Sequence, residues 1–235
     1  MLEESIVVCW SGGKDSTMML YELFRSRQYR VAALLTTMTK GFDRISMHGV
    51  RRELLEAQAH SLGLRLHKVY ISQQASNQEY ESKMEAMLRM FMANGIQSIA
   101  FGDIFLEDLK KYREDNLRKI GMKGIFPIWK RDTTELVRTF IDLGFKAYLS
   151  CIDTKVLDSS FAGRLIDQSF LNDLPKNIDP CGENGEFHTF VFDGPLFRNK
   201  IECEPGEIRM TERFCFRDLV PKKAPIIAIP KGEAI

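Results

Sequence analysis

The chain has 235 residues, of which 44% are apolar and 28% are charged, as expected for a globular protein with a substantial core. Lys and Arg number 33 against 32 Asp and Glu, which leaves a formal net charge of +1 and no basic stripe, so tRNA and DNA are not expected as partners. No apolar run approaches the roughly 20 residues of a spanning helix, and the first residues lack the basic region of a signal peptide. The five cysteines include no C-x-x-C pair, which argues against a disulfide framework and a closed zinc or iron–sulfur site. We therefore expect a cytoplasmic protein without a membrane partner, and the composition leaves a homo-oligomer open.

Short apolar runs alternate with longer helical patterns through the first 152 residues. We predict strands over residues 5–10, 31–36, 64–71, 96–101, 124–128 and 145–152. We predict helices over residues 17–26, 48–62, 79–93, 109–120 and 134–143. Helices of this length between strands imply parallel crossovers. The fold class is therefore α/β, with a parallel sheet that carries helices on both faces.

The pattern changes after about residue 175, where prolines and glycines mark a loop. Strands follow without intervening helices, over residues 187–192, 200–204 and 208–216. We expect a smaller, mainly β subdomain beside the sheet. The predicted division is an α/β domain over residues 1–152, a subdomain over 153–220, and a proline-containing tail over 221–235.

A glycine-rich loop lies between the first predicted strand and the first predicted helix, with the sequence Ser11-Gly12-Gly13-Lys14-Asp15-Ser16. The two glycines let the backbone bring its N–H groups close to an anion, and the start of a helix adds further donors and a positive dipole end. Lys14 adds a positive charge, whereas Asp15 beside phosphates implies a bridging cation, Mg²⁺. The loop is not a Walker A motif, because Lys14 is followed by Asp. We predict a phosphate site, with a simple strand-to-helix turn as the alternative.

The loop resembles the S-G-G-x-D-S signature of the ATP pyrophosphatase superfamily. The resemblance implies a sheet of the adenine-nucleotide α-hydrolase-like (HUP) kind with ATP lying across the strand ends. It also implies that ATP is cleaved to AMP and pyrophosphate, that the loop holds the departing pyrophosphate, and that a second substrate is activated.

Further blocks narrow the resemblance to one branch. They are Trp10, residues 46–50, residues 102–104 and residues 127–129. The most specific block is Gly182-Glu183-Asn184-Gly185-Glu186-Phe187-His188-Thr189, followed by residues 193–197. Together these blocks resemble the diphthine–ammonia ligase family, particularly its prokaryotic members, from about residue 5 to residue 200.

This resemblance implies a ligase in which the carboxylate of diphthine attacks the α-phosphate of ATP and ammonia then displaces AMP to give an amide. In a bacterium the acyl substrate would differ, so a small-molecule or protein-bound acyl substrate is expected. No glutaminase-like segment occurs within the chain, so free ammonia or an amine is the expected nitrogen donor.

Candidate site residues follow from the loop and from these blocks. The expected ATP-binding residues are those of the loop together with Thr36, His48 and Gly102. Asp103 is a candidate metal or substrate contact at a strand end, with a helix-capping aspartate as the alternative. The alternative interpretation of His48 is an ordinary surface residue at the start of a helix.

Catalysis is expected from Lys14, Asp15 and Glu186, with Asp15 also the expected Mg²⁺ ligand. Glu183 and Glu186 are predicted to contact the substrate, although two carboxylates on a glycine turn are ordinarily solvated.

Two other functions remain open from the sequence. Cys181-Gly182 invites comparison with phosphoadenylyl-sulfate reductases, which share the loop but lack the Glu-Asn-Gly-Glu-Phe block. A nucleotide-sensing module of the HUP fold would bind ATP without cleaving it, and a complete pyrophosphate loop with its aspartate argues against such a sensor.

Overall fold

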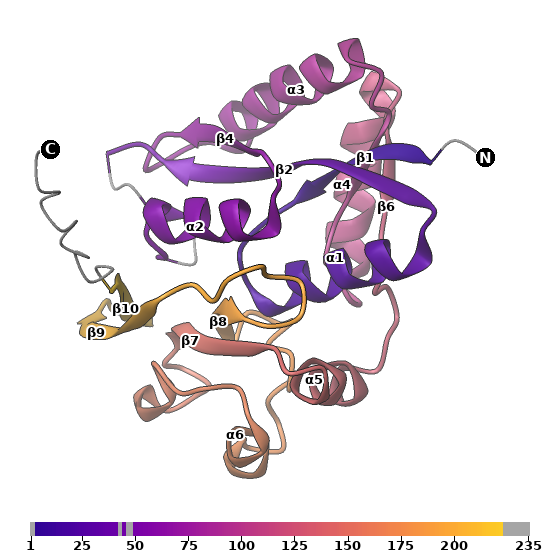
Figure 1. Cartoon of the computed structure of the whole chain (residues 1–235). Coiled ribbons are helices and arrows are strands. Elements are labelled where there is room, and N and C mark those ends of the chain that lie inside the picture. The colour runs from indigo at the N-terminus through magenta and orange to yellow at the C-terminus, as the bar shows by residue number, and fades with distance from the viewer. Residues whose placement is uncertain (1–2, 42–43, 46–48, 223–235) are drawn as a thin grey trace, which may run out of the picture.

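The computed structural model describes residues 3–41, 44–45 and 49–222 (Figure 1). Its first half consists of strands followed by helices. They are β1 (Glu4–Cys9), α1 (Lys14–Ser26), β2 (Tyr29–Thr39), β3 (Arg44–Ile45), α2 (Arg52–Leu62), β4 (Leu66–Ile71), α3 (Asn77–Ala93), β5 (Ser98–Ala100), α4 (Glu107–Ile120) and β6 (Lys123–Ile125). Five strands pair in parallel in the order β4-β2-β1-β5-β6, and the short β3 adds antiparallel to β2.

Helices cover both faces of this sheet. In β1, Ile6 and Val8 pack into the cluster that holds α1 and α2, whereas Val7 between them packs into the cluster that holds α3 and α4. A parallel sheet buried on both faces needs apolar residues at every position of its central strands, which the sequence of β1 supplies. The predicted α/β class with a parallel sheet is confirmed.

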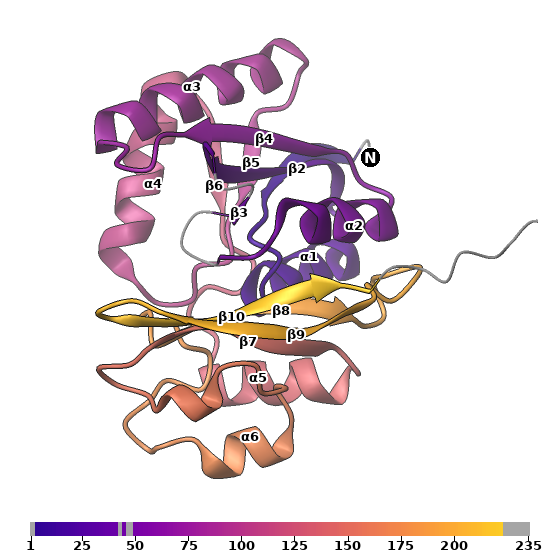
Figure 2. The same cartoon turned by 90° about the vertical axis from the view of Figure 1, so that its left-hand side faces the viewer.

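The second half forms an antiparallel sheet backed by helices. Its elements are α5 (Thr133–Asp142), β7 (Lys146–Asp153), a 3₁₀ helix (Ser159–Phe161), α6 (Gln168–Asp173), β8 (Phe187–Asp193), β9 (Cys203–Met210) and β10 (Phe214–Pro221). The strand order is β8-β7-β10-β9. In Figure 2, α5 and α6 lie below this sheet and the parallel half lies above it. The predicted small β subdomain is confirmed.

Several details differ from the sequence predictions. The strand expected over 145–152 forms as β7 but pairs with β8 and β10, because Ala147 and Leu149 pack with α5 and α6 in the second core. The strand expected over 208–216 is interrupted by a turn, in which Thr211 N–H donates to the Phe214 carbonyl at 2.8 Å. Two short helices between β7 and β8 were not predicted. The division of the chain at residue 152 stays a prediction.

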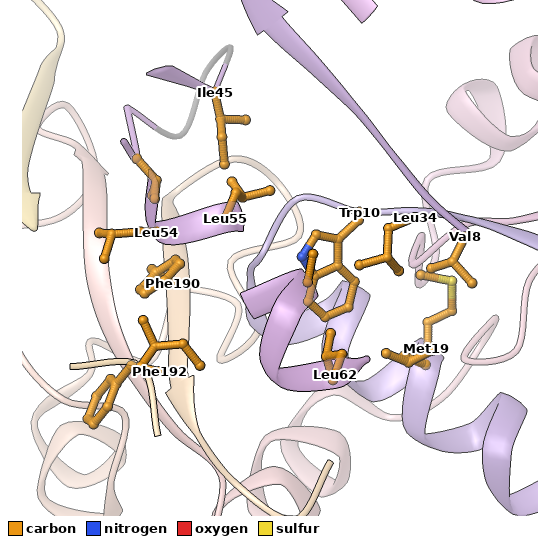
Figure 3. Packing of buried hydrophobic residues seen from close by; sticks show 14 of the residues in the cluster. Val8, Trp10, Met19, Leu34, Ile45, Leu54, Leu55, Leu62, Phe190 and Phe192 are labelled. Atoms are coloured by element: carbon orange, nitrogen blue, oxygen red, sulfur yellow. The ribbon is translucent and has the colours of Figure 1, made fainter. Parts of the chain in front are cut away.

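A shared apolar cluster joins the two halves. In Figure 3, Leu55 of α2 lies between Phe190 of β8 and Trp10, which follows β1, and Leu54 lies beside Phe190. Phe190 and Leu55 are fully buried, and Trp10 is 1% exposed. Burial of large apolar side chains is the main favourable term in folding, so this cluster fixes the antiparallel sheet against the carboxyl end of β1.

Candidate active site

A cleft lies at the carboxyl ends of β1, β2 and β5, with the segment of residues 181–189 as its opposite wall. It encloses about 1070 Å³, counting the part open to solvent. Its lining brings together eight of the predicted residues: Ser11, Gly13, Asp15, Ser16, Thr36, Gly102, Asp103 and Glu183. Gly12, Lys14 and Glu186 are not among the lining residues. His48 lies outside the described residues.

The loop of residues 11–16, called the pyrophosphate loop below, turns at Gly12 with a φ of +77°. A Cβ on Gly12 would also lie 2.6 Å from Gln58 Oε1, so both conformation and space require glycine. Gly102, which follows β5, also packs closely, because a Cβ there would lie 3.0 Å from the carbonyl of Asp15. Gly102 therefore lets β5 approach the start of α1 and forms one side of the cleft.

Strand β8, which belongs to the antiparallel sheet, anchors the pyrophosphate loop through two hydrogen bonds. Val191 N–H donates to the Gly12 carbonyl at 2.9 Å, and Lys14 N–H donates to Thr189 Oγ1 at 2.9 Å. These contacts join residues about 180 positions apart, so no local pattern could have predicted them. The loop is thus fixed by both sheets.

Gln58 of α2 completes this anchoring and was not predicted. Its side chain is fully buried. Oε1 accepts from the Trp10 indole N–H at 3.0 Å, and Nε2 donates to the carbonyls of Gly12, at 3.0 Å, and Val191. One amide therefore ties α2 to the pyrophosphate loop and to β8.

We expect Gln58→Met to lower ATP affinity about tenfold or more and stability by about 3 kcal/mol, since it leaves a buried indole N–H and two carbonyls without their partner. Ser61→Ala is the matched control, because Ser61 Oγ on the same helix bonds the Asn199 backbone and not the loop. Chemical unfolding and calorimetric titration with ATP separate the two effects. Equal ATP affinity in the two variants would contradict a role for Gln58 in shaping the loop.

Lys14 and Asp15 form an ion pair at the start of α1. Lys14 is fully buried, while the side chain of Asp15 keeps 31% of its surface exposed and faces the cleft. Burial alone would lower the pKa of Lys14, but nearby carboxylates, above all Asp15, raise it above its ordinary value. Lys14 therefore stays charged beneath the cleft, and Asp15 is the member of the pair that is exposed to solvent.

Asp103 is held by a residue that was not predicted, Arg113 of α4. Arg113 Nε and Nη2 donate to the two carboxylate oxygens of Asp103 at 2.7 and 3.1 Å, and its guanidinium lies 4.5 Å from the centre of the Phe101 ring. All three residues line the cleft. This bidentate geometry fixes the Asp103 carboxylate at the end of β5.

Glu183 reaches across the cleft to the parallel half. Its Oε1 accepts from the backbone N–H groups of Ile104 at 2.7 Å and Phe105 at 3.4 Å. Burial raises the pKa of Glu183 to about 7, with a contribution from the Asp15 carboxylate. A carboxyl with this pKa can bind or release a proton near neutral pH.

Glu186 is buried behind the cleft wall, at 6% exposure. Its Oε1 accepts from Asp179 N–H and Asn184 Nδ2, both at 3.1 Å, whereas its buried Oε2 has no hydrogen-bond partner. The side chain thus braces the turn that carries Glu183. A catalytic role for Glu186 and a contact with substrate stay predictions.

Cys181 and His188 also line the cleft. Burial raises the pKa of the Cys181 thiol to about 12, and its Sγ donates to the Thr133 carbonyl at 3.3 Å. A protonated, hydrogen-bonded thiol is a poor nucleophile, which disfavours the reductase alternative. Burial, and after it the charge of Lys14, lowers the pKa of His188 to about 4, so its ring is neutral at pH 7.

The parallel sheet, the Ser-Gly-Gly-Lys-Asp-Ser loop at the end of β1 and the cleft above it define a nucleotide-binding protein of the PP-loop class. Comparison with known proteins gives the family. Residues 4–124 match the diphthamide synthase N-terminal domain, and residues 132–223 match the diphthamide synthase C-terminal domain. The two matches account for most of the chain, which belongs to the diphthamide synthase family.

Curated relatives carry the name diphthine–ammonia ligase. The human protein is 28% identical over 136 residues, which cover 55% of this chain and 51% of that protein. The Schizosaccharomyces pombe protein is 26% identical over 218 residues, covering 84% of this chain and 36% of that protein. The Danio rerio protein is 24% identical over 219 residues, covering 84% and 85%. The chain spans about half the length of the mammalian relatives that it matches.

Among solved structures, the U34-tRNA thiolase NcsA from Methanococcus maripaludis matches 60% of this chain and 57% of its own, with 17% identity and a TM-score of 0.38. Similarity of this extent has no bearing on activity.

Proposed function

We propose that the chain is an ATP-dependent ligase of the diphthine–ammonia ligase type. A carboxylate oxygen of the acyl substrate attacks the α-phosphorus of ATP, and the bond to the bridging oxygen of pyrophosphate breaks. The nitrogen of ammonia then attacks the acyl carbon, the bond to AMP breaks, and an amide forms. Adenylation helps because AMP is a far better leaving group than the oxygen of a free carboxylate.

The observation that supports this proposal best is the ion pair between buried Lys14 and cleft-facing Asp15, within a loop fixed by β8 and Gln58. A fixed loop with its donors at the cleft stabilises charge on departing pyrophosphate without reorganising. The Ser16 hydroxyl donates to the Gly13 carbonyl at 2.9 Å, whereas Ser11, whose hydroxyl lies 3.1 Å from that of Ser16, lines the cleft and can supply a further donor. A loop of this kind suits the α–β bond of ATP better than it suits γ-phosphate transfer.

The residues present fit a magnesium ion that arrives with ATP. Mg²⁺ in nucleotide sites takes one or two carboxylates and completes its coordination with phosphate oxygens and water. Asp15 offers one such carboxylate on the cleft side, and the described residues contain no group of three or more potential metal ligands. When bound, Mg²⁺ would neutralise charge on pyrophosphate, with Asp15 holding it.

The opposite wall supplies the acceptor side of the proposed site. Glu183 on that wall and Asp103 at the end of β5 present carboxylates to the cleft, which favour ammonium or another cation. Glu186 acts through Glu183, because it braces the turn on which Glu183 sits. The acyl substrate is a small molecule or a protein-bound group, and no nucleic acid is required.

The proposed setting is cytoplasmic. Within the part of the chain that the structure describes, no helix has the length and apolar character to cross a membrane.

The direct test is product analysis with ATP, Mg²⁺, ammonia and candidate acyl substrates. We expect AMP and pyrophosphate in equal amounts, together with an amide. ADP and phosphate as the stoichiometric products would refute the proposed reaction, and nucleotide binding without cleavage in any mixture would favour a sensor.

Glu183 predicts the pH dependence. If its ionised form accepts the proton of the incoming nitrogen, amide formation by the wild type should rise as pH passes through about 7. Because ammonia itself also deprotonates as pH rises, the informative quantity is the ratio of wild-type to Glu183→Gln rates. This ratio should increase from pH 6 to pH 8, and a flat ratio would remove Glu183 from the chemistry.

The same group gives a stability signature. The pKa of Glu183 in the folded state lies above its ordinary value, so near neutral pH the folded state binds a proton that the unfolded state has released. The free energy of unfolding therefore falls as pH rises from the ordinary pKa of a glutamate to about 7. Glu183→Gln should therefore raise the Tm more at pH 8 than at pH 5.

A further inference from the structure

Among the described residues, nothing pairs with the outer edge of the antiparallel sheet. β9 pairs with β10, and no other described strand pairs with β9. Figure 1 shows β9 at the margin of the molecule, beside β10. An open strand edge presents unpaired backbone N–H and C=O groups that can pair with another chain.

The last four residues of β9 protect such an edge only through two charged side chains of opposite sign, Glu207 and Arg209. Pro205 blunts the first half of the strand, but residues 207–210 contain neither proline nor lysine. Ile208 is 49% exposed and Met210 is 59% exposed, and they are the two most exposed large apolar side chains among the described residues. Single exposed apolar residues are common, but two on one face of an open edge indicate an interface.

Two charged residues interleave with this apolar pair. Glu207 and Arg209 are exposed, and neither forms an ion pair or side-chain hydrogen bond with another described residue. Side chains alternate along a strand, so Glu207 and Arg209 share the face opposite to Ile208 and Met210. The register supports this arrangement, with Arg209 opposite Phe216 and Ile208 opposite Arg217.

The sequence of this edge is complementary to itself. Antiparallel pairing of two copies about Ile208 places Glu207 of each copy opposite Arg209 of the other, and the two Ile208 side chains opposite each other. Directly opposed residues of unlike charge stabilise antiparallel pairs. An acidic peptide would satisfy Arg209 but would oppose Glu207, so a second copy of this chain fits better.

We propose that β9 pairs with β9 of a second copy about a two-fold axis at Ile208, which joins the two four-stranded sheets into one. The contact is isologous, as in most homodimers. A pairing that spans only residues 206–210 of each copy is short beside the roughly 1,200 Å² that stable interfaces bury, so we expect a weak dimer that forms at high protein concentration. This inference does not depend on the proposed ligase activity.

Exchanging the charges of Glu207 and Arg209 tests the register of the proposed β9–β9 pairing. In sedimentation equilibrium over a concentration series, the wild type should pass from monomer to dimer. Glu207→Arg alone and Arg209→Glu alone should each weaken the dimer about tenfold or more, because like charges then face each other twice. The double variant E207R/R209E should dimerise as the wild type does.

Mixing the two single variants gives the sharpest outcome. An E207R chain and an R209E chain are complementary, so their equimolar mixture should form a heterodimer although neither forms a homodimer. Ile208→Lys should abolish dimers in every background, whereas Val156→Lys, at a comparably exposed apolar residue elsewhere, should leave them intact. Circular dichroism confirms that each variant is folded.

Three results would overturn the proposal. The first is a wild type that stays monomeric at the highest concentrations reached. The second is a dimer that persists in both single charge variants, which would place the interface elsewhere. The third is a mixture of the single variants that remains monomeric, which would exclude this register.

Discussion

Replacing Asp15 by asparagine is expected to lower ATP cleavage at least about 100-fold and, at the same time, to destabilise the fold. The catalytic loss follows from removing the one carboxylate of the pyrophosphate loop, which faces the cleft. The structural loss follows because Lys14 is fully buried and would keep its charge without a partner. Removing one member of a buried pair costs about 3 kcal/mol. Activity alone therefore cannot separate chemistry from folding in this variant.

The double variant Lys14→Met/Asp15→Asn makes the separation. Methionine fills the space of the lysine side chain, and the double variant leaves no unpaired buried charge, so most of the stability should return. AMP formation should stay at the level of Asp15→Asn, and ATP should bind with little dependence on Mg²⁺. Chemical unfolding, calorimetric titration with and without Mg²⁺, and AMP release provide the three readouts. If the double variant regained turnover, the pair would be structural only.

The sequence predicts the nucleotide half of this protein well because the signals there are local. The apolar run of β1, the two glycines and the start of α1 are contiguous, so the pyrophosphate loop and its place at a strand end follow from residues 4–26 alone. The C′ position of Gly63 is likewise local, and the structure gives it a φ of +70°.

The parts that the sequence does not predict depend on distant contacts. β7 has the apolar content of another parallel strand, and only its packing against α5, α6 and β8 places it in the second sheet. Gln58 lies on a helix with no motif, yet it contacts Gly12, 46 positions away, and Val191, 133 positions away. The 3₁₀ helix and α6 have three and six residues, too few for a clear periodicity.

The turn between β9 and β10 was missed for another reason. Residues 208–216 have apolar or aromatic residues near both ends, and the reversal at Thr211 contains no glycine, proline or asparagine to mark it. The hydrogen bonds that close the turn involve the hydroxyl of Thr211, which accepts from Phe214 N–H at 2.9 Å. Threonine is only a weak turn signal.

Arg113 is a cleft residue that sequence reasoning missed, and Arg113→Ala is expected to have a large effect. Asp103 is 8% exposed, so the loss of both guanidinium bonds leaves a nearly buried carboxylate without a cation. That carboxylate loses the contact that fixes its orientation, so its charge is no longer held at the proposed acceptor side of the cleft. We expect amide formation to fall about 100-fold and stability to fall by about 3 kcal/mol.

A second arginine–aspartate pair in the same protein provides the control for this variant. Arg213 donates to Asp153 Oδ2 from Nε at 2.8 Å and from Nη2 at 2.7 Å, and Asp153 is 4% exposed. Neither residue lines the cleft. Arg213→Ala should therefore lower stability by a smaller amount, since Arg213 is itself 55% exposed, and should leave ligase activity unchanged at temperatures where the protein is folded. Arg113→Lys should recover part of the stability but little of the activity, because an ammonium cannot make the bidentate contact. Activity equal to wild type in folded Arg113→Ala would show that Asp103 needs no fixed orientation and would remove both residues from the proposed acceptor site.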